Sequence, residues 1–121
     1  MIKLKSYLKH HYLLGVTAEK FKGGSKKFLE NVVKTDYIKL IGPKINGRIE
    51  ESPILTSDIK AININNNVLH YFDVSNMGDY SHSHYALEID DYIIHFQIRS
   101  LETKEETHAI FAQFFNNISF K

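Results

Sequence analysis

The sequence contains no cysteine, and this absence removes several kinds of chemistry together. Disulfide bonds, thiolate zinc sites and cysteine nucleophiles all require that residue. No apolar run approaches the roughly 20 residues that a membrane-spanning helix needs. The start of the chain also lacks the hydrophobic stretch and the cleavage site of a signal peptide. We therefore expect a soluble, cytoplasmic protein.

The chain also lacks internal repeats, low-complexity tracts and any stretch that resembles an interdomain linker. Its 121 residues correspond to about one domain, and 43% of them are apolar. Together with fifteen Phe and Tyr residues, this composition is sufficient to close a single hydrophobic core. We expect residues 1–121 to form one α+β domain.

The net charge of +1 conceals a division between the two parts of the chain. Residues 1–48 carry eleven Lys and Arg against three acidic residues, a net charge of +8. Residues 49–121 carry four Lys and Arg against eleven acidic residues, a net charge of −7. Such fields steer association over long range. The basic part could contact nucleic acid, the acidic part could bind a basic protein, or the two parts could attract each other across the fold.

The stretch from Ser81 to Ser100 predicts a β-hairpin that turns at Asp90 and Asp91. Side chains alternate between the two faces of a strand, so a two-residue turn fixes which residues lie opposite each other. On one, largely apolar face, the expected pairs are Ile89–Tyr92, Leu87–Ile94, Tyr85–Phe96 and Ser83–Ile98. The other face is polar and carries His82, His84, Ala86 and Glu88 against Ile93, His95, Gln97 and Arg99. We expect this polar face to be exposed, at least in part.

Apolar residues at helical spacing predict three helices. The first covers residues 2–14 and ends at Gly15, and a polar loop follows over residues 17–24. Ser25 is expected to cap the second helix, whose buried stripe is Phe28, Leu29, Val32 and Val33. The third begins at Thr103, which forms a capping-box pattern with Glu106. Its apolar face follows at intervals of three and four residues: Ile110, Phe111, Phe114, Phe115 and Ile118.

Between these helices the sequence predicts strands joined by short turns. Residues 37–41 and 45–49 have strand character around Gly42-Pro43, and residues 50–58 form a connection or an edge. Residues 58–64 and 68–75 flank the turn-forming run of Asn65, Asn66 and Asn67, and residues 76–80 are expected to be a loop. The predicted fold class is α+β, with a meander-like antiparallel sheet of about five or six strands. Two N-terminal helices and one C-terminal amphipathic helix are expected to pack on one face.

The run from His84 to His95 resembles the histidine hairpin of the lecithin:retinol acyltransferase-like branch of papain-like hydrolases. An aromatic residue follows the first histidine, and an acidic turn precedes the strand that ends in the second. The resemblance implies that His84 is a catalytic base and His95 its orienting partner. It covers about a tenth of the chain, and the turn is one residue shorter than in the family. Because no cysteine can serve as nucleophile, that acyl-transfer chemistry cannot run here.

Two further functions remain open. His84 and His95, with Arg99 as a cation on the same face, could form a metal-independent nuclease or degenerate hydrolase site. We expect no metal and no cofactor, because the further candidate ligands lack a diagnostic zinc spacing: His70, His82, Glu88 and Asp79. Alternatively, the exposed cations Lys22, Lys26 and Lys27 could contact the phosphates of nucleic acid. Both groups are also typical of ordinary solvated surface.

Acidic and tyrosine side chains form the remaining candidate site, a protein-binding one. We expect it at or near one end of the predicted hairpin, with the residues Asp79, Tyr80, Glu88, Asp90 and Asp91. Carboxylates beside tyrosines suit a cationic protein surface. Since no catalytic set is complete, we expect a small, bacterial, non-enzymatic binding protein. The immunity or antitoxin class, which neutralises a basic, nuclease-like toxin domain, is the expected function by analogy with other small proteins of this composition.

Overall fold

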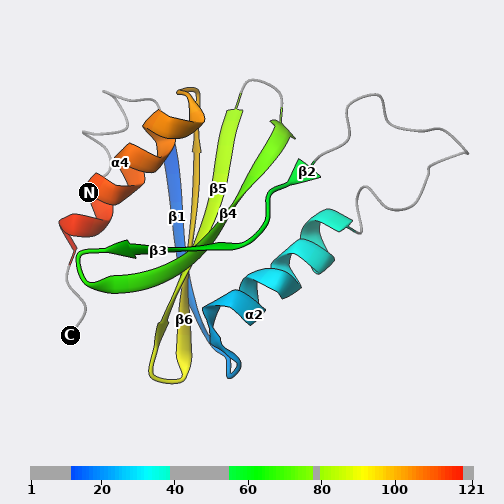
Figure 1. Ribbon diagram of the computed structural model, residues 1–121, viewed down its shortest axis with the longest axis vertical. Helices are drawn as coiled ribbons and strands as arrows, with labels where there is room; N and C mark the ends of the chain where they lie inside the picture. The colour runs from blue at the N-terminus through cyan, green and yellow to red at the C-terminus, as the bar shows by residue number, and fades with distance from the viewer. Residues whose placement is uncertain (1–11, 39–54, 78–79, 119–121) are drawn as a thin grey trace, which may run out of the picture.

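The computed structural model describes residues 12–38, 55–77 and 80–118, and shows an α+β fold in which two helices flank an antiparallel sheet (Figure 1). The strands are β1 (Tyr12–Lys20), β2 (Leu55–Thr56), β3 (Lys60–Ile64), β4 (Asn67–Met77), β5 (Tyr80–Ile89) and β6 (Tyr92–Ser100). The helices are α2 (Gly24–Val32), which continues into a π-helical turn η1 (Val33–Ile38), and α4 (Lys104–Asn116). The predicted α+β class is confirmed.

The sheet is a meander to which the first strand is added out of order. Its strand order is β1-β6-β5-β4-β2, and β3 also pairs with β4. Strands β3 to β6 are joined as successive antiparallel hairpins, whereas β1 lies beside β6, with Tyr12 opposite Ser100 and Lys20 opposite Tyr92. As a result β5 and β6, the strands of the predicted hairpin, lie inside the sheet.

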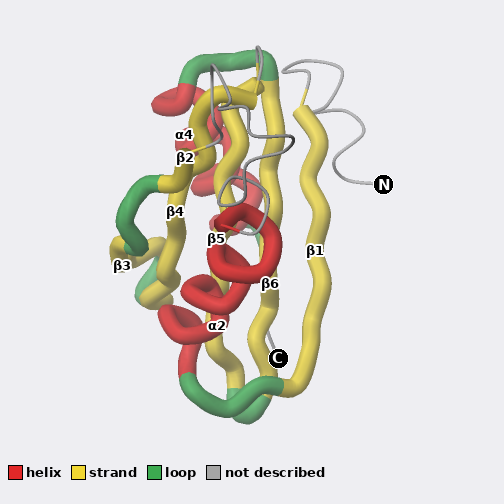
Figure 2. Tube along the Cα trace, turned by 90° about the vertical axis from the view of Figure 1, so that its right-hand side faces the viewer, coloured by secondary structure: helices red, strands yellow, loops and turns green. Residues whose placement is uncertain are grey.

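The two helices cover opposite faces of the sheet, as the side view shows (Figure 2). Residues of α4 pack against alternate side chains of β5 and β6, including Tyr85 and Phe96. Residues of α2 pack against the other set, including Ala86 and Ile93. The prediction that all helices lie on one face is wrong, because the central strands carry apolar side chains on both faces and each face needs a cover.

The predicted hairpin has the register that the sequence indicates. Ile89 lies opposite Tyr92, Tyr85 opposite Phe96 and Ser83 opposite Ile98. Asp90 adopts a left-handed conformation with φ of 56° in the two-residue turn, as tight hairpin turns require. The turn between β3 and β4 is confirmed as well, since Asn65 and Asn66 have φ of 53° and 66°.

The N-terminal part of the described chain corrects three predictions. Residues 12–14 belong to β1 and not to a helix, Gly15 lies within that strand, and residues 17–20 continue it. The remainder of the predicted first helix lies outside the described residues. The strand is stabilised by its backbone pairing with β6 along its whole length. That pairing is remote in sequence, so local helical spacing could not reveal it.

Smaller differences concern element ends. The N-cap of α2 is Gly23, with φ of 138°, and not Ser25, which lies inside the helix. Tyr37 belongs to η1 and not to a strand, and the predicted strand at residues 45–49 lies outside the described residues. Residues 76–77 belong to β4 and Tyr80 to β5, and not to the expected loop, whose other two residues lie outside the described ones. In α4 the predicted cap is present, since Thr103 Oγ accepts a hydrogen bond from the Glu106 N–H at 3.1 Å.

Candidate functional site

The histidine face of the predicted hairpin is buried beneath α2 and η1. His82, His84 and His95 are 5%, 1% and 8% exposed. They share this face with Phe72 and Ile93, which pack against Phe28, Leu29 and Tyr37 from the helical layer. The predicted exposure of this face is wrong for the three histidines, because the apolar side chains around them are covered by a helix. It holds for Glu88, Gln97 and Arg99, which are exposed on the same face.

A chain of hydrogen bonds links three of the buried side chains. The Tyr37 hydroxyl lies 2.6 Å from His84 Nε2, and His84 Nδ1 lies 2.9 Å from His95 Nε2. The Phe72 ring stacks on the His84 imidazole, with 4.7 Å between the ring centroids. A neutral imidazole has one donor and one acceptor nitrogen, so the direction of one hydrogen bond fixes the other. The sequence did not indicate the contact between Tyr37 and His84, because residues 37–41 were predicted to form a strand.

Burial keeps all three histidines neutral at pH 7. Burial, with Arg99 and His95 adding repulsion, lowers the pKa of His82 to about 4. Burial and the neighbouring His82 lower the pKa of His84 to about 2. Burial also lowers the pKa of His95, opposed by the Asp36 carboxylate. Burial, followed by Asp36, raises the pKa of Tyr37 to about 12, so this phenol remains protonated.

This arrangement gives the histidines little access to a substrate. A general base has to reach the proton that it removes, and α2 and η1 lie between His84 and solvent. Arg99 remains exposed on the same face, but it lies opposite His82 and not beside the His84–His95 pair. Within residues 12–38, 55–77 and 80–118, no group of three His, Asp or Glu is placed to hold a metal ion. The buried histidines act here as polar members of the core.

A second polar cluster fastens α4 to the other face of the sheet. The Asp73 carboxylate accepts hydrogen bonds from Ser83 Oγ at 2.6 Å and from His108 Nε2 at 2.8 Å. The other His108 nitrogen is bonded to the Tyr85 hydroxyl. Burial alone would raise the pKa of Asp73, but the hydrogen bonds from His108 and Ser83 outweigh it and hold that pKa below its usual value. Ser83 bonds to Asp73 and not to His108, so the cluster contains no serine–histidine nucleophile pair.

A serine–histidine contact does occur at the start of α2. Ser25 Oγ lies 2.6 Å from His70 Nδ1 on β4, and burial, followed by Lys26, lowers the pKa of His70. Such a pair can activate a hydroxyl when a third group orients the imidazole. Among the described residues no carboxylate is hydrogen-bonded to His70, and Ser25 is buried. We interpret the contact as one that fixes the first turn of α2 on the sheet.

The predicted acidic site is divided between two ends of β5. Glu88, Asp90 and Asp91 are exposed at the hairpin turn, with the half-exposed Tyr92 beside them. Tyr80 begins the same strand ten residues away, which is about 30 Å at the usual rise of an extended strand. There it lies 5.6 Å from the guanidinium carbon of Arg99. Asp79 lies outside the described residues. The structure therefore groups Glu88, Asp90 and Asp91, which we call the acidic tip together with Tyr92, and excludes Tyr80 from it.

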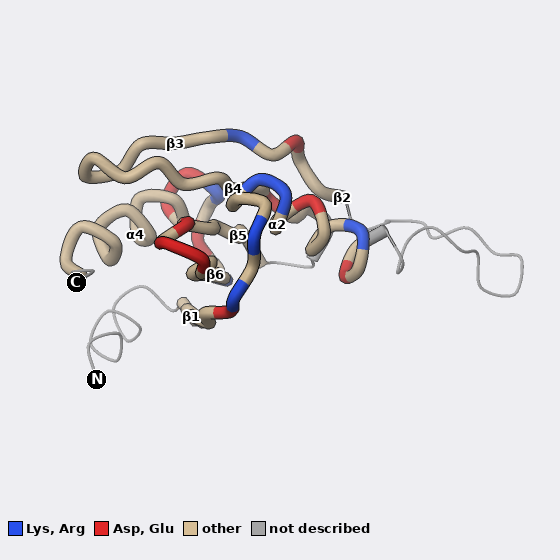
Figure 3. Tube along the Cα trace, turned by 90° about the horizontal axis from the view of Figure 1, so that it is seen from below, with Lys and Arg blue, Asp and Glu red and all other residues tan. Residues whose placement is uncertain are grey.

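The basic segment that follows β1 lies against the acidic tip. The Phe21 N–H donates to the Asp91 carbonyl oxygen at 2.9 Å, which holds the exposed Lys22 near the turn. Lys26 and Lys27 are exposed in the first turn of α2. Figure 3 shows these lysine-bearing segments close to the acidic ones. Within the described residues no ion pair joins these lysines to the tip, so the attraction between the two parts of the chain stays a prediction.

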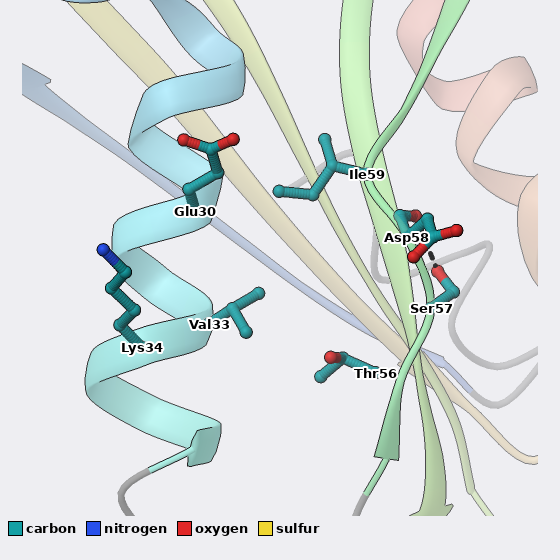
Figure 4. Close-up of a pocket in the computed structure, with 7 residues that line it drawn as sticks. All are labelled: Glu30, Val33, Lys34, Thr56, Ser57, Asp58 and Ile59. Atoms are coloured by element: carbon teal, nitrogen blue, oxygen red, sulfur yellow. Dashed lines mark hydrogen bonds between the residues drawn. The ribbon is translucent and has the colours of Figure 1, made fainter.

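Two surface clefts flank α2. The larger, about 510 Å³, lies between α2 and the segment that joins β2 to β3 (Figure 4). There Val33 and Ile59 point toward each other across the opening, whereas Lys34 points away from it. The smaller, about 280 Å³, lies between α2 and β1 and includes Glu19 and Asp36. None of the predicted site residues lines either cleft.

None of the described helices is long and apolar enough to cross a membrane.

Comparison of the sequence with protein-family models and with curated proteins found no match.

Proposed function

We propose that the chain is a non-enzymatic protein-binding module of the immunity or antitoxin kind, and that the acidic tip is part of its binding surface. The observation that supports this most directly is the exposure of Glu88, Asp90 and Asp91 at one turn, next to the half-exposed Tyr92. Carboxylates at an exposed position raise the rate of association with a cationic partner, and tyrosine adds contact area.

The positions of the reactive side chains support the same proposal. His84 and His95 are hydrogen-bonded to each other and buried beneath α2 and η1. The partly buried His108 is engaged with Asp73 and Tyr85. Catalysis at His84 with Arg99 remains a prediction that would require α2 to move. Nucleic-acid binding by Lys22, Lys26 and Lys27 also remains a prediction, and the adjacent acidic tip would oppose it by repelling phosphates.

Charge reversal at the tip tests the proposal. A protein captured from the source cells with the wild-type chain should bind the Asp90→Lys/Asp91→Lys variant about 10- to 100-fold more weakly, with a flatter salt dependence, because two attractions become repulsions. Isothermal titration at low and at high salt measures both. The matched control is Glu30→Lys/Asp58→Lys, which makes the same change in net charge at the larger cleft.

Two results would contradict the proposal. Equal loss of affinity in the tip variant and in the control would show that net charge, and not the tip, is recognised. Hydrolysis of RNA or of an ester by the purified chain, abolished in His84→Ala with the fold intact by circular dichroism, would replace a binding function by an enzymatic one.

A further inference from the structure

The smaller cleft, between α2 and β1, has the composition of a pocket for a cationic side chain. It is lined by Phe21 and Phe28, with Val32 beside them. The two rings meet edge to face, 5.4 Å apart at 82°, and Phe28 packs in turn against His95. This cleft, which we call the α2–β1 groove, is thus backed by the packed core.

Both charged residues that line the groove are acidic. Glu19 lies on the α2 face of β1 because side chains alternate along a strand, and the same alternation sends Lys20 to the opposite face. Asp36 lies on η1, and its carboxylate acts electrostatically on the inner residues Tyr37 and His95. No Lys or Arg lines the groove. Within the described residues, neither carboxylate forms an ion pair with a cation of the chain itself.

The polar lining adds acceptors to these two charges. Asn31 and Thr35 lie on the same side of α2 and η1 as the groove. An arginine side chain has the complementary form, with an apolar stem that packs on aromatic and aliphatic surface and a planar guanidinium that bonds to carboxylates and stacks on rings. The volume of about 280 Å³ falls just below the roughly 300 Å³ at which small-molecule pockets begin. A single long side chain therefore fits it better than a larger ligand.

The groove continues the surface proposed above. Phe21, which lines the groove, donates its N–H to the Asp91 carbonyl oxygen in the acidic tip. Glu19 and Glu88 lie on either side of Ile93 on the same face of the sheet. A partner that contacts the tip can therefore reach the groove without leaving the surface.

From these observations we propose that the α2–β1 groove receives an arginine side chain of the protein partner, held between the carboxylates of Glu19 and Asp36 over the Phe21 and Phe28 rings. This inference rests on the proposed binding function and identifies an anchor for it. The tip would guide a basic partner toward the surface, and the groove would select a side chain by shape as well as charge.

The groove can be tested without knowing the partner, using Nα-acetylarginine amide as the probe. In amide-resolved NMR titrations the probe should shift the signals of Glu19, Asn31 and Thr35, which line the groove, in a saturable manner. Nα-acetylcitrulline amide, which has the same shape but no charge, should bind at least about tenfold more weakly, since hydrogen bonds to charged groups are the stronger ones. Equal binding of the two probes, or no shift at these residues, would overturn the inference.

Substitutions of the groove carboxylates provide a second test of arginine binding. Glu19→Gln and Asp36→Asn should each weaken arginine binding about threefold to tenfold. The matched control Glu30→Gln removes the same charge from the opposite side of α2 and should leave binding unchanged. Asp36 is exposed but precedes the buried Tyr37, so folding of each variant is checked by circular dichroism. Glu19→Gln keeps the test valid if Asp36→Asn does not fold. If Glu19→Gln and Glu30→Gln behave alike, the groove is not the site.

The two proposals can fail separately. Loss of partner binding on charge reversal of the tip, combined with no arginine binding in the groove, would retain the binding function and reject the anchor. Arginine binding in the groove, combined with a tip variant that binds the partner as tightly as the wild type, would retain the anchor and reject the tip as part of the binding surface.

Discussion

Lowering the pH from 7 to 5 should destabilise the protein through its buried histidines. An unfolded histidine has a pKa near 6.5, whereas burial lowers the pKa of His82 to about 4 and that of His84 to about 2. Below pH 6.5 these histidines are therefore protonated in the unfolded chain but remain neutral in the folded chain. The stability from these neutral histidines is fully present above pH 6.5 and is lost as the pH falls from there through each folded pKa.

The loss of stability depends on how far the pH lies below the pKa of an unfolded histidine. At pH 5 the solution is about 1.5 units below the unfolded pKa, and each unit corresponds to about 1.4 kcal/mol for each histidine that remains neutral. His82 and His84 together should therefore reduce the free energy of unfolding by about 4 kcal/mol. His95 adds to this loss, because burial lowers its pKa as well. The loss is large against the roughly 5–15 kcal/mol that stabilises a typical domain.

Urea unfolding followed by circular dichroism at pH 7, 6 and 5, at constant ionic strength, measures this loss. His82→Phe identifies one contributor, because His82 Nδ1 is buried without a hydrogen-bond partner in the described part of the chain. The variant should lose about 2 kcal/mol less than the wild type between pH 7 and 5. A free energy of unfolding that stays constant over this range would refute the argument, and so would an identical pH dependence in the variant.

Two substitutions test the contacts that hold the helices. Tyr37→Phe leaves His84 Nε2 without its partner and should lower the free energy of unfolding by about 1–3 kcal/mol. Tyr92→Phe, at a half-exposed hydroxyl, should change it little, and equal effects in urea unfolding would contradict the assigned hydrogen bond. Thr103→Ala removes the acceptor for the Glu106 N–H and should cost about 1 kcal/mol in thermal unfolding. Thr103→Ser should recover most of that loss, and a Ser variant as unstable as the Ala variant would rule out the cap.

The elements that the sequence predicts best are those whose signals are local. The β5–β6 hairpin needs only the alternation of side chains and a two-residue acidic turn, and its register is confirmed at every predicted pair. The cap of α4 is equally local, since Thr103 and Glu106 are three residues apart. In both cases neighbouring residues suffice to specify the geometry.

The failures concern contacts between segments far apart in the sequence. β1 obtains its hydrogen bonds from β6, about eighty residues later, and its outer half is exposed on both faces. It therefore lacks the strict alternation that identifies a half-buried strand. The histidine face was predicted to be exposed, at least in part, and the burial of the histidines was missed because the hairpin alone does not show what covers them. A signal was nevertheless present, since Phe72, Val74 and Ile93 form an apolar surface around the histidines on that face.

The position of α2 decides where function can reside. By covering β5 and β6 the helix withdraws His84 and His95 from solvent, and by standing between β1 and the β2–β3 connection it creates the two clefts. A substitution that loosens α2 would expose the histidines and destroy the α2–β1 groove together, so its effect could not separate catalysis from binding. Substitutions at exposed Glu19, Asp90 and Asp91 leave the helix in place. If these alone alter binding while the acid sensitivity of the fold is unchanged, the buried histidines serve stability and the surface beside α2 serves recognition.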